Sequence, residues 1–167
     1  MAECYTVRVT KDHLVFCSGH FITYEGSQCE RLHGHNYRVA VEVSSPLDLN
    51  HYVFDFIALK KITMRFCDEL DHRMLLPTRN PLVQIQADQQ QVTARFKDKY
   101  WSFPAEDCVL LPIENTTAEL LAKYLGQKIS DTLQKEFQYS PPFLAVEVEE
   151  SFGQSARYEE RHGGSCV

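Results

Sequence analysis

The chain has 167 residues, of which 44% are hydrophobic, and a formal net charge of −6. This length suits one domain that buries roughly 70% of its unfolded surface. An acidic chain without a basic stripe is not a general nucleic-acid binder, although a small anionic substrate needs only a few local cations. The first residues show no apolar signal core, and no apolar run approaches the ~20 residues of a membrane span. We therefore expect a cytoplasmic protein without a membrane partner.

The hydrophobic pattern first predicts two neighbouring strands. Residues 5–22 and 33–45 alternate between apolar and polar positions, and residues 23–32 predict a long loop between them. Side chains two apart on a strand point to the same face, so both histidines of the second strand lie on its apolar face. That face consists of His33, His35, Tyr37, Val39, Val41 and Val43.

Two amphipathic helices and a further strand follow. Asp55 is placed to cap a first helix, and a second helix is predicted from residues 115–117 to about Phe137. The apolar stripe of the first helix is Leu59, Ile62, Phe66 and Leu70. The buried face of the second helix is Leu121, Leu125, Ile129 and Leu133. The last predicted strand carries Val146, Val148 and Glu150 on one side.

Residues 81–112, between the two helices, predict an inserted hairpin. Val92, Ala94 and Phe96 alternate on the outgoing strand, and Trp101 and Phe103 lie on the returning one. No repeat or linker divides the chain, so we expect residues 1–167 to form a single domain. The predicted fold class is α+β, an antiparallel sheet with two helices packed on one face.

Three histidines form the most informative cluster in the sequence. The hairpin aims His20, His33 and His35 at one point, and three neutral imidazoles describe a zinc site with an open coordination position, as in catalytic sites. A single histidine on an apolar face is more often a hydrogen-bonded core residue. Three in convergent register favour metal binding.

Two roles are open for Cys29, which lies in the loop between His20 and His33. As a fourth ligand it would close the site and make it structural. As a thiolate beside the metal it would be a base or nucleophile, because a nearby divalent cation lowers the pKa of a thiol. Spacing alone leaves both roles open.

Two further segments carry candidate acid–base groups. Asp71 and His72 follow the first helix, either as a polar helix end or as a carboxylate that orients an imidazole in a proton relay. Glu150 lies on the buried side of its strand, where a carboxylate needs a cationic or multi-donor partner. A guanidine-like ligand edge would serve through two hydrogen bonds, and an ion pair with Arg8 or Arg38 is the alternative.

The start of the second helix has a local explanation of its own. Residues 116–119 match a capping box, in which Thr116 is followed three residues later by Glu119. This role suffices to explain the glutamate.

Together these segments resemble the family of 6-pyruvoyltetrahydropterin and 6-carboxytetrahydropterin synthases. The resemblance covers nearly the whole chain apart from residues 81–112, and its motifs follow the family's order. They are Phe16-Cys-Ser-Gly-His20, Cys29-x-x-x-His33-Gly-His35-Asn-Tyr37, Asp55-Phe56, Leu70-Asp71-His72, Thr117-Ala-Glu119 and Val146-Glu-Val-Glu-Glu150. The resemblance implies the tunnelling fold, with a four-stranded antiparallel sheet and two helices per subunit. It also implies a homohexamer built from two trimers, and 7,8-dihydroneopterin triphosphate as substrate.

The resemblance also implies roles for individual residues. His20, His33 and His35 would hold the zinc, which acts as a Lewis acid on the substrate side chain. Cys29 would be the general base, assisted by Asp71 and His72 as a proton relay. Glu150 would bind the amino-pyrimidine edge of the pterin, and Thr117 and Glu119 would lie near it.

The product follows less directly. Three residues between Cys29 and His33 resemble bacterial 6-carboxytetrahydropterin synthases, which release acetaldehyde and lead toward queuosine and other deazaguanines. The alternative is the pyruvoyl product of the tetrahydrobiopterin-type pathway. Two features depart from a compact carboxy enzyme: the insertion, and Ser-Gly-His20 where Ala-Ala-His is more familiar. A non-catalytic zinc- or pterin-binding module is an alternative of another class, but it would not need Cys29 or the Asp71–His72 pair.

Overall fold

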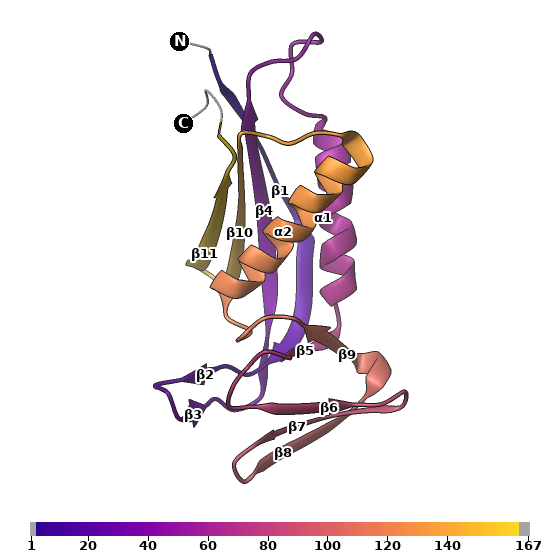
Figure 1. Cartoon of the computed structure of the whole chain (residues 1–167), viewed down its shortest axis with the longest axis vertical. Helices are drawn as coiled ribbons and strands as arrows, with labels where there is room; N and C mark the ends of the chain where they lie inside the picture. The colour runs from indigo at the N-terminus through magenta and orange to yellow at the C-terminus, as the bar shows by residue number, and fades with distance from the viewer. Residues whose placement is uncertain (1–2, 164–167) are drawn as a thin grey trace.

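A computed structural model describes residues 3–163. Its centre is a six-stranded sheet in the order β11-β10-β4-β1-β5-β9, with both helices on one face (Figure 1). The strands are β1 (Tyr5–His20), β4 (His33–Ser45), β5 (Arg73–Pro77), β9 (Cys108–Leu111), β10 (Phe143–Ser151) and β11 (Gln154–Arg161). The fold class is α+β, as the sequence predicts.

The sheet has two strands beyond the four that the resemblance implies. β11, β10, β4 and β1 form the antiparallel part, and β5 and β9 extend it by parallel pairing. The parallel part begins where Ser18 pairs with Arg73, just after the first helix. The three residues after Arg73 are all apolar and buried, so β5 lacks the alternation that marks a half-buried strand.

Both helices pack as the sequence predicts, and the first begins at its predicted cap. Helix α1 (Phe56–Leu70) follows Asp55, whose side chain accepts a hydrogen bond from the backbone N–H of Ala58 at 2.7 Å. Helix α2 (Ala118–Phe137) ends at Gln138, which has a left-handed backbone with φ of 52°. All eight residues of the two predicted apolar stripes are buried in one core against the sheet.

The insertion forms a small three-stranded sheet rather than a hairpin alone. The predicted hairpin is present as β7 (Gln91–Phe96) and β8 (Lys99–Pro104), with Ala94 opposite Trp101. A third strand, β6 (Gln84–Ala87), pairs with β7, and a 3₁₀ turn, η1 (Ala105–Asp107), leads into β9.

The insertion packs beside the loop that precedes β4. That loop contains a short hairpin of β2 (Thr23–Tyr24) and β3 (Gln28–Cys29), which lies next to β6, β7 and β8 at the lower end of Figure 1. A second apolar cluster joins the two parts. Its members include Phe21, Cys29, Met74, Val92 and Phe96.

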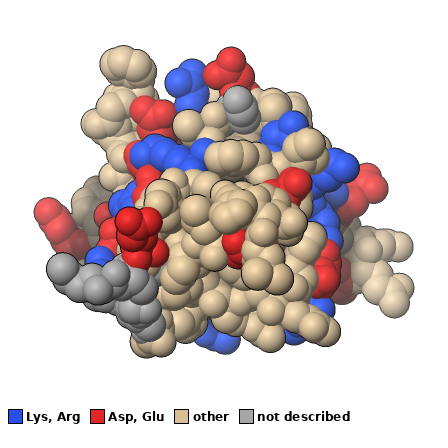
Figure 2. Space-filling model, turned by 90° about the horizontal axis from the view of Figure 1, so that it is seen from above, with Lys and Arg blue, Asp and Glu red and all other residues tan. Residues whose placement is uncertain are grey.

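Surface chemistry agrees with the composition. Within residues 3–163, no helix is both long and apolar enough to span a membrane. On the face seen from above, Lys and Arg side chains are interspersed with Asp and Glu around a mostly uncharged centre (Figure 2).

Candidate metal centre and substrate hollow

The three predicted histidines lie together at the end of the sheet where β1 ends and β4 begins. His20 and His33 are direct partners in the antiparallel ladder, and His35 pairs with Ser18. The ring centroids are 4.7 Å apart for His20 and His33, 5.3 Å for His20 and His35, and 4.9 Å for His33 and His35. One ring nitrogen from each histidine lies within 4.8 Å of the others, so the group could hold a metal ion.

Backbone carbonyls fix which ring nitrogen faces the centre. Nδ1 of His20 lies 2.9 Å from the carbonyl oxygen of Thr116, and Nδ1 of His33 lies 2.8 Å from that of Arg31. A carbonyl oxygen only accepts, so each Nδ1 carries the proton and each neutral ring keeps a lone pair on Nε2. Nε2 of His20 is buried and has no hydrogen-bond partner among residues 3–163. Burial also lowers the pKa of His20, which favours the neutral, ligating form. This donor set fits zinc.

Cys29, in the loop between His20 and His33, is not part of this group. Among the described residues, the group that could hold a metal contains the three histidines and neither a thiol nor a carboxylate. The Cys29 thiol is buried and contacts the carbonyl oxygen of Glu30 at 3.5 Å. Burial raises the pKa of Cys29, and the positive charge of Lys99 opposes that shift.

Glu150 contacts the histidine group instead of a neighbouring arginine. Its Oε1 lies 3.5 Å from Nε2 of His20, 3.9 Å from Nε2 of His35 and 3.5 Å from the hydroxyl of Tyr37. The ion pair offered as an alternative does not form with Arg8, whose partners are Glu42 and Glu147.

Tyr37 is a site residue that the sequence placed only on the apolar face of its strand. The ring is buried, 5.8 Å from that of His20 and 5.6 Å from that of His35, and its hydroxyl donates to Glu150. Burial raises the pKa of Tyr37, so it remains a neutral donor. Because it lies two residues after His35 on the same strand face, the sequence could have predicted that Tyr37 lies at the site.

Three residues that the resemblance assigns to the pterin line one hollow. Thr117, Glu119 and Glu150 surround a space of about 350 Å³ together with Gln154, Ser155 and Ala156 of β11. The predicted capping box is wrong by one position. Thr117, not Thr116, caps α2, and the Thr116 hydroxyl donates to the carbonyl oxygen of Phe21 at 3.0 Å. Glu119 is thus one residue too early for a capping box and faces the hollow instead.

Asp71 and His72 contact each other, and the further contact of Asp71 is with the backbone of Cys17. Asp71 accepts the backbone N–H of Cys17 and contacts Nδ1 of His72, each at 2.7 Å. The His72 side chain is 81% exposed. Within the described residues, these contacts do not bring the pair to Cys29 or to the three histidines.

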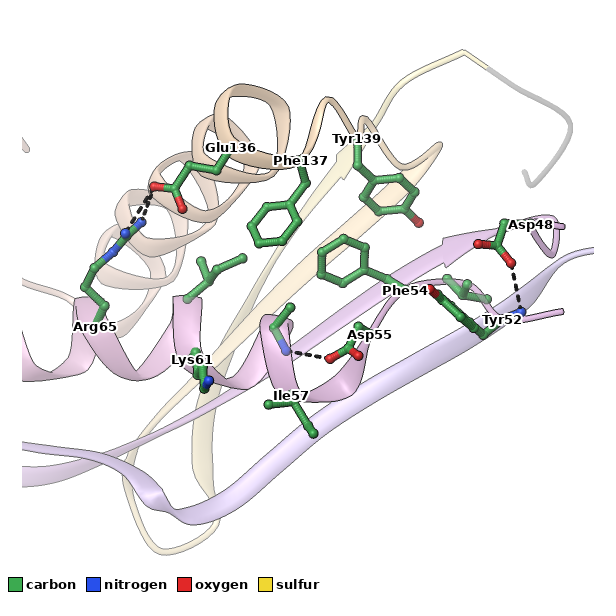
Figure 3. A pocket seen from close by; sticks show the side chains of 13 residues that line it. Asp48, Tyr52, Phe54, Asp55, Ile57, Lys61, Arg65, Glu136, Phe137 and Tyr139 are labelled. Carbon is green, nitrogen blue, oxygen red and sulfur yellow. Dashed lines mark hydrogen bonds and ion pairs between the residues drawn. The ribbon is translucent and has the colours of Figure 1, made fainter. Parts of the chain in front are cut away.

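A larger hollow of about 940 Å³ lies at the opposite end of the helices. It is lined by the loop before α1, the first turns of α1 and the end of α2, with Phe54, Phe137 and Tyr139 as an aromatic wall (Figure 3). The ring of Phe54 is 4.9 Å from that of Tyr139 and 5.3 Å from that of Phe137. None of the residues that line it belongs to the predicted site.

Comparison with known proteins identifies the family. Residues 8–161 match the model of the 6-pyruvoyl tetrahydropterin synthase family. The chain belongs to this family. Among curated relatives, a Methanocaldococcus jannaschii protein named as a 6-carboxy-5,6,7,8-tetrahydropterin synthase is 36% identical over 146 residues, which cover 87% of this chain and 89% of the relative. The Aquifex aeolicus 6-carboxy-5,6,7,8-tetrahydropterin synthase is 29% identical over 131 residues, or 77% of this chain and 74% of that one.

Solved structures of the tetrahydropterin synthase family share the fold. The 6-pyruvoyl tetrahydropterin synthase of Plasmodium vivax superimposes with a TM-score of 0.89 at 29% identity and covers 96% of this chain and 99% of its own. The Plasmodium falciparum enzyme gives a TM-score of 0.84 at 29% identity, with 95% and 99% covered. Variants of the P. vivax enzyme have been solved in which a glutamate described as a catalytic residue is replaced. The chain is therefore an enzyme, a lyase of the tetrahydropterin synthase type.

Proposed function

We propose that this enzyme converts 7,8-dihydroneopterin triphosphate to 6-carboxy-5,6,7,8-tetrahydropterin, with release of triphosphate and acetaldehyde. The names of the curated relatives support this product, as does the spacing of three residues between Cys29 and His33. On this proposal the enzyme serves queuosine or related deazaguanine synthesis in the cytoplasm.

One observation carries the proposal: Nε2 of His20 is buried without a hydrogen-bond partner among three convergent imidazoles. Burying a polar nitrogen without a partner costs free energy unless a ligand binds it. A zinc ion suits a set of three imidazole nitrogens. His20, His33 and His35 would hold the ion, which supplies Lewis-acid polarisation of the substrate's side-chain oxygens.

The remaining residues divide the work on the substrate. Cys29 would take a proton from the side chain of the pterin substrate, since its thiol is not among the groups that could hold the metal and would remain free to act as a base. The Glu150 carboxylate would accept hydrogen bonds from the amino-pyrimidine edge, with Tyr37 orienting it. Thr117 and Glu119 line the same hollow and would contact the ring.

Glu30 is a second candidate for the proton acceptor. Its Oε2 lies 3.9 Å from Nε2 of His33, and it directly follows Cys29. The glutamate described as catalytic in the P. vivax enzyme supports a carboxylate as the proton acceptor. Replacing each residue separately will assign the role.

The Asp71–His72 pair is proposed to act across a subunit boundary. Its own contacts run to Cys17 rather than Cys29, so a relay would need a neighbouring copy. β11 and β9 are the outer strands of the sheet, and such edges pair readily with other chains. We propose a homohexamer of two trimers, in which these edges join.

A second candidate product is the 6-pyruvoyl compound. The close superposition with the P. vivax and P. falciparum enzymes favours it, because these structures cover the inserted sheet as well. Both products require the same zinc site and the same loss of triphosphate.

Product analysis tests the proposal. The purified, zinc-loaded enzyme is incubated with 7,8-dihydroneopterin triphosphate, and triphosphate, acetaldehyde and pterins are measured. Acetaldehyde with the carboxy product supports the proposal, whereas a diketo product without acetaldehyde supports the pyruvoyl alternative. Absence of triphosphate release would point to a non-catalytic binding module. Cys29→Ala should keep its zinc and lose turnover, but loss of zinc would make Cys29 a ligand.

A further inference from the structure

Two lysines of the inserted sheet contact the loop that carries Cys29 and Glu30. Lys99, the first residue of β8, donates from Nζ to the carbonyl oxygens of Cys29 at 2.6 Å and Glu30 at 3.1 Å. Lys97, in the turn before β8, donates to the carbonyl oxygen of Ser27 at 2.7 Å. Charge-assisted hydrogen bonds of this kind are stronger than neutral ones. The insertion therefore holds three carbonyl groups of the loop backbone, those of Ser27, Cys29 and Glu30.

Apolar packing ties the same loop to the insertion. The ring of Phe21, next to the ligand His20, stacks on Trp101 of β8 at 4.5 Å and 14°. The Cys29 side chain lies in the cluster that also contains Val92 and Phe96 of β7. The position of the thiol therefore depends on the inserted sheet as well as on β3.

The charges around Cys29 oppose one another. Burial and the nearby Glu30 carboxylate raise the pKa of the thiol, and Lys99 is the cation that counteracts them. Cys108, from β9, is the other titratable group in the same apolar cluster. Among the protein groups that act on the Cys29 thiol, Lys99 is the one that favours the thiolate, so losing it removes that support.

We propose that Lys99 is a positioning residue: it fixes the backbone of Cys29 and Glu30 from the inserted sheet and supplies the positive charge that favours the Cys29 thiolate. On this proposal the inserted sheet contributes to the reaction through Lys99. The inference rests on the proposed function, in which Cys29 or Glu30 accepts a proton. It holds for either acceptor, because Lys99 contacts both carbonyls.

The test compares three variants of the zinc-loaded enzyme. Lys99→Met removes the charge at nearly constant length, Lys99→Arg keeps it, and Lys97→Met removes the neighbouring lysine, which does not touch Cys29 or Glu30. Alkylation of Cys29 by iodoacetamide is followed by peptide mass spectrometry across a pH series, with kcat, KM, zinc content and Tm measured in parallel. The midpoint of the alkylation profile reports the charge at the thiol, and its high-pH plateau reports access.

For Lys99→Met we expect Cys29 alkylation near neutral pH to fall about 3- to 10-fold, through a midpoint shifted to higher pH. We also expect kcat to fall about tenfold with KM within about twofold of wild type, since the substrate contacts are elsewhere. Lys99→Arg should restore both, and Lys97→Met should change neither.

An unchanged midpoint in Lys99→Met, or an equal shift in Lys97→Met, would overturn the proposal. So would a loss of Tm and zinc that Lys99→Arg fails to rescue, since that pattern marks a structural residue only. Should Lys99→Met fail to fold, Lys99→Gln provides the same comparison. If the wild-type enzyme released no triphosphate from the substrate, the proposed function would fail, while the alkylation profile would still decide the effect of Lys99 on the thiol.

Discussion

Nδ1 of His20 lies 2.9 Å from the carbonyl oxygen of Thr116, a residue 96 positions further along the chain. This hydrogen bond sets the orientation of the ring at the end of β1 by means of the residue just before the α2 cap. The same helix start presents Thr117 and Glu119 to the hollow that Glu150 also lines. The metal centre and the hollow are thus built on one shared junction.

Replacing His20, His33 or His35 singly by Ala should reduce bound zinc from about one ion per chain to near zero. Zinc added at roughly 100 times its Kd stabilises a folded protein by about 2.7 kcal/mol, or about 5–10 °C in Tm for a chain of this size. The variants should lose this shift, measured by elemental analysis and thermal unfolding with and without chelator. His13→Ala, at an exposed position of β1, is the matched control. Full zinc content in any triad variant would contradict the assignment.

The clustering of the three histidines was predictable because strand parity is a local property. His33 and His35 share a face with Tyr37 in any regular strand, and the apolar residues that follow show which face is inward. Asp55 was predictable for the same reason, since a cap bonds within three residues of itself.

Contacts between distant segments could not be predicted in this way. β11 carries Gln154, Ser155, Arg157 and Glu159, which do not alternate between apolar and polar residues as a half-buried strand does. Its place in the sheet depends on pairing with β10. The hydrogen bond from Lys99 to Cys29 joins residues 70 positions apart, and no local sequence pattern around either residue predicts it. The cap of α2 was misplaced by one residue because Thr116 and Thr117 are chemically equal, and the tertiary bond of Thr116 to Phe21 decides between them.

Replacing Glu150 by Gln should raise KM for the pterin substrate about 10- to 100-fold while zinc content stays the same. Loss of a hydrogen bond to a charged group costs about 1.5–3 kcal/mol, which gives this range. Steady-state kinetics and zinc analysis on the same preparations make the measurement. Glu149→Gln is the control, since Glu149 accepts the backbone N–H of Gly153 and an amide oxygen can still do so. If zinc were lost with Glu150, the carboxylate would be a ligand rather than a substrate contact.

The pH dependence of stability should contain a contribution from Glu42, which bonds Arg157 of β11 and Arg8 of β1 across the sheet. The hydrogen bond from Arg157 is the main cause that lowers the pKa of Glu42. A carboxyl with a lower pKa in the folded state stabilises above its unfolded pKa of roughly 4.3 and loses that contribution as pH falls. Because Arg8 is 46% exposed, we expect at most about 1 kcal/mol.

Urea unfolding at pH 7 and pH 3.5, with chelator present to remove any effect of zinc, checks this expectation. Glu42→Gln should be less stable than the wild type at pH 7 and nearly equal to it at pH 3.5. A constant difference at both pH values would show that the ion pairs do not titrate with folding.

Gly126 of α2 lies close to Tyr158 of β11, and its replacement by Ala should destabilise the fold. A Cβ at this position would lie 2.6 Å from Cδ1 of Tyr158, so the ring or the helix must move. Crowding of this kind costs about 1–3 kcal/mol, against a gain of about 1 kcal/mol in helix propensity. We expect a net loss of about 1 kcal/mol and a Tm lower by about 2–4 °C. In a Tyr158→Ala background the clash is gone, so Gly126→Ala should instead raise Tm. The same sign in both backgrounds would show that Tyr158 does not limit the approach of the helix.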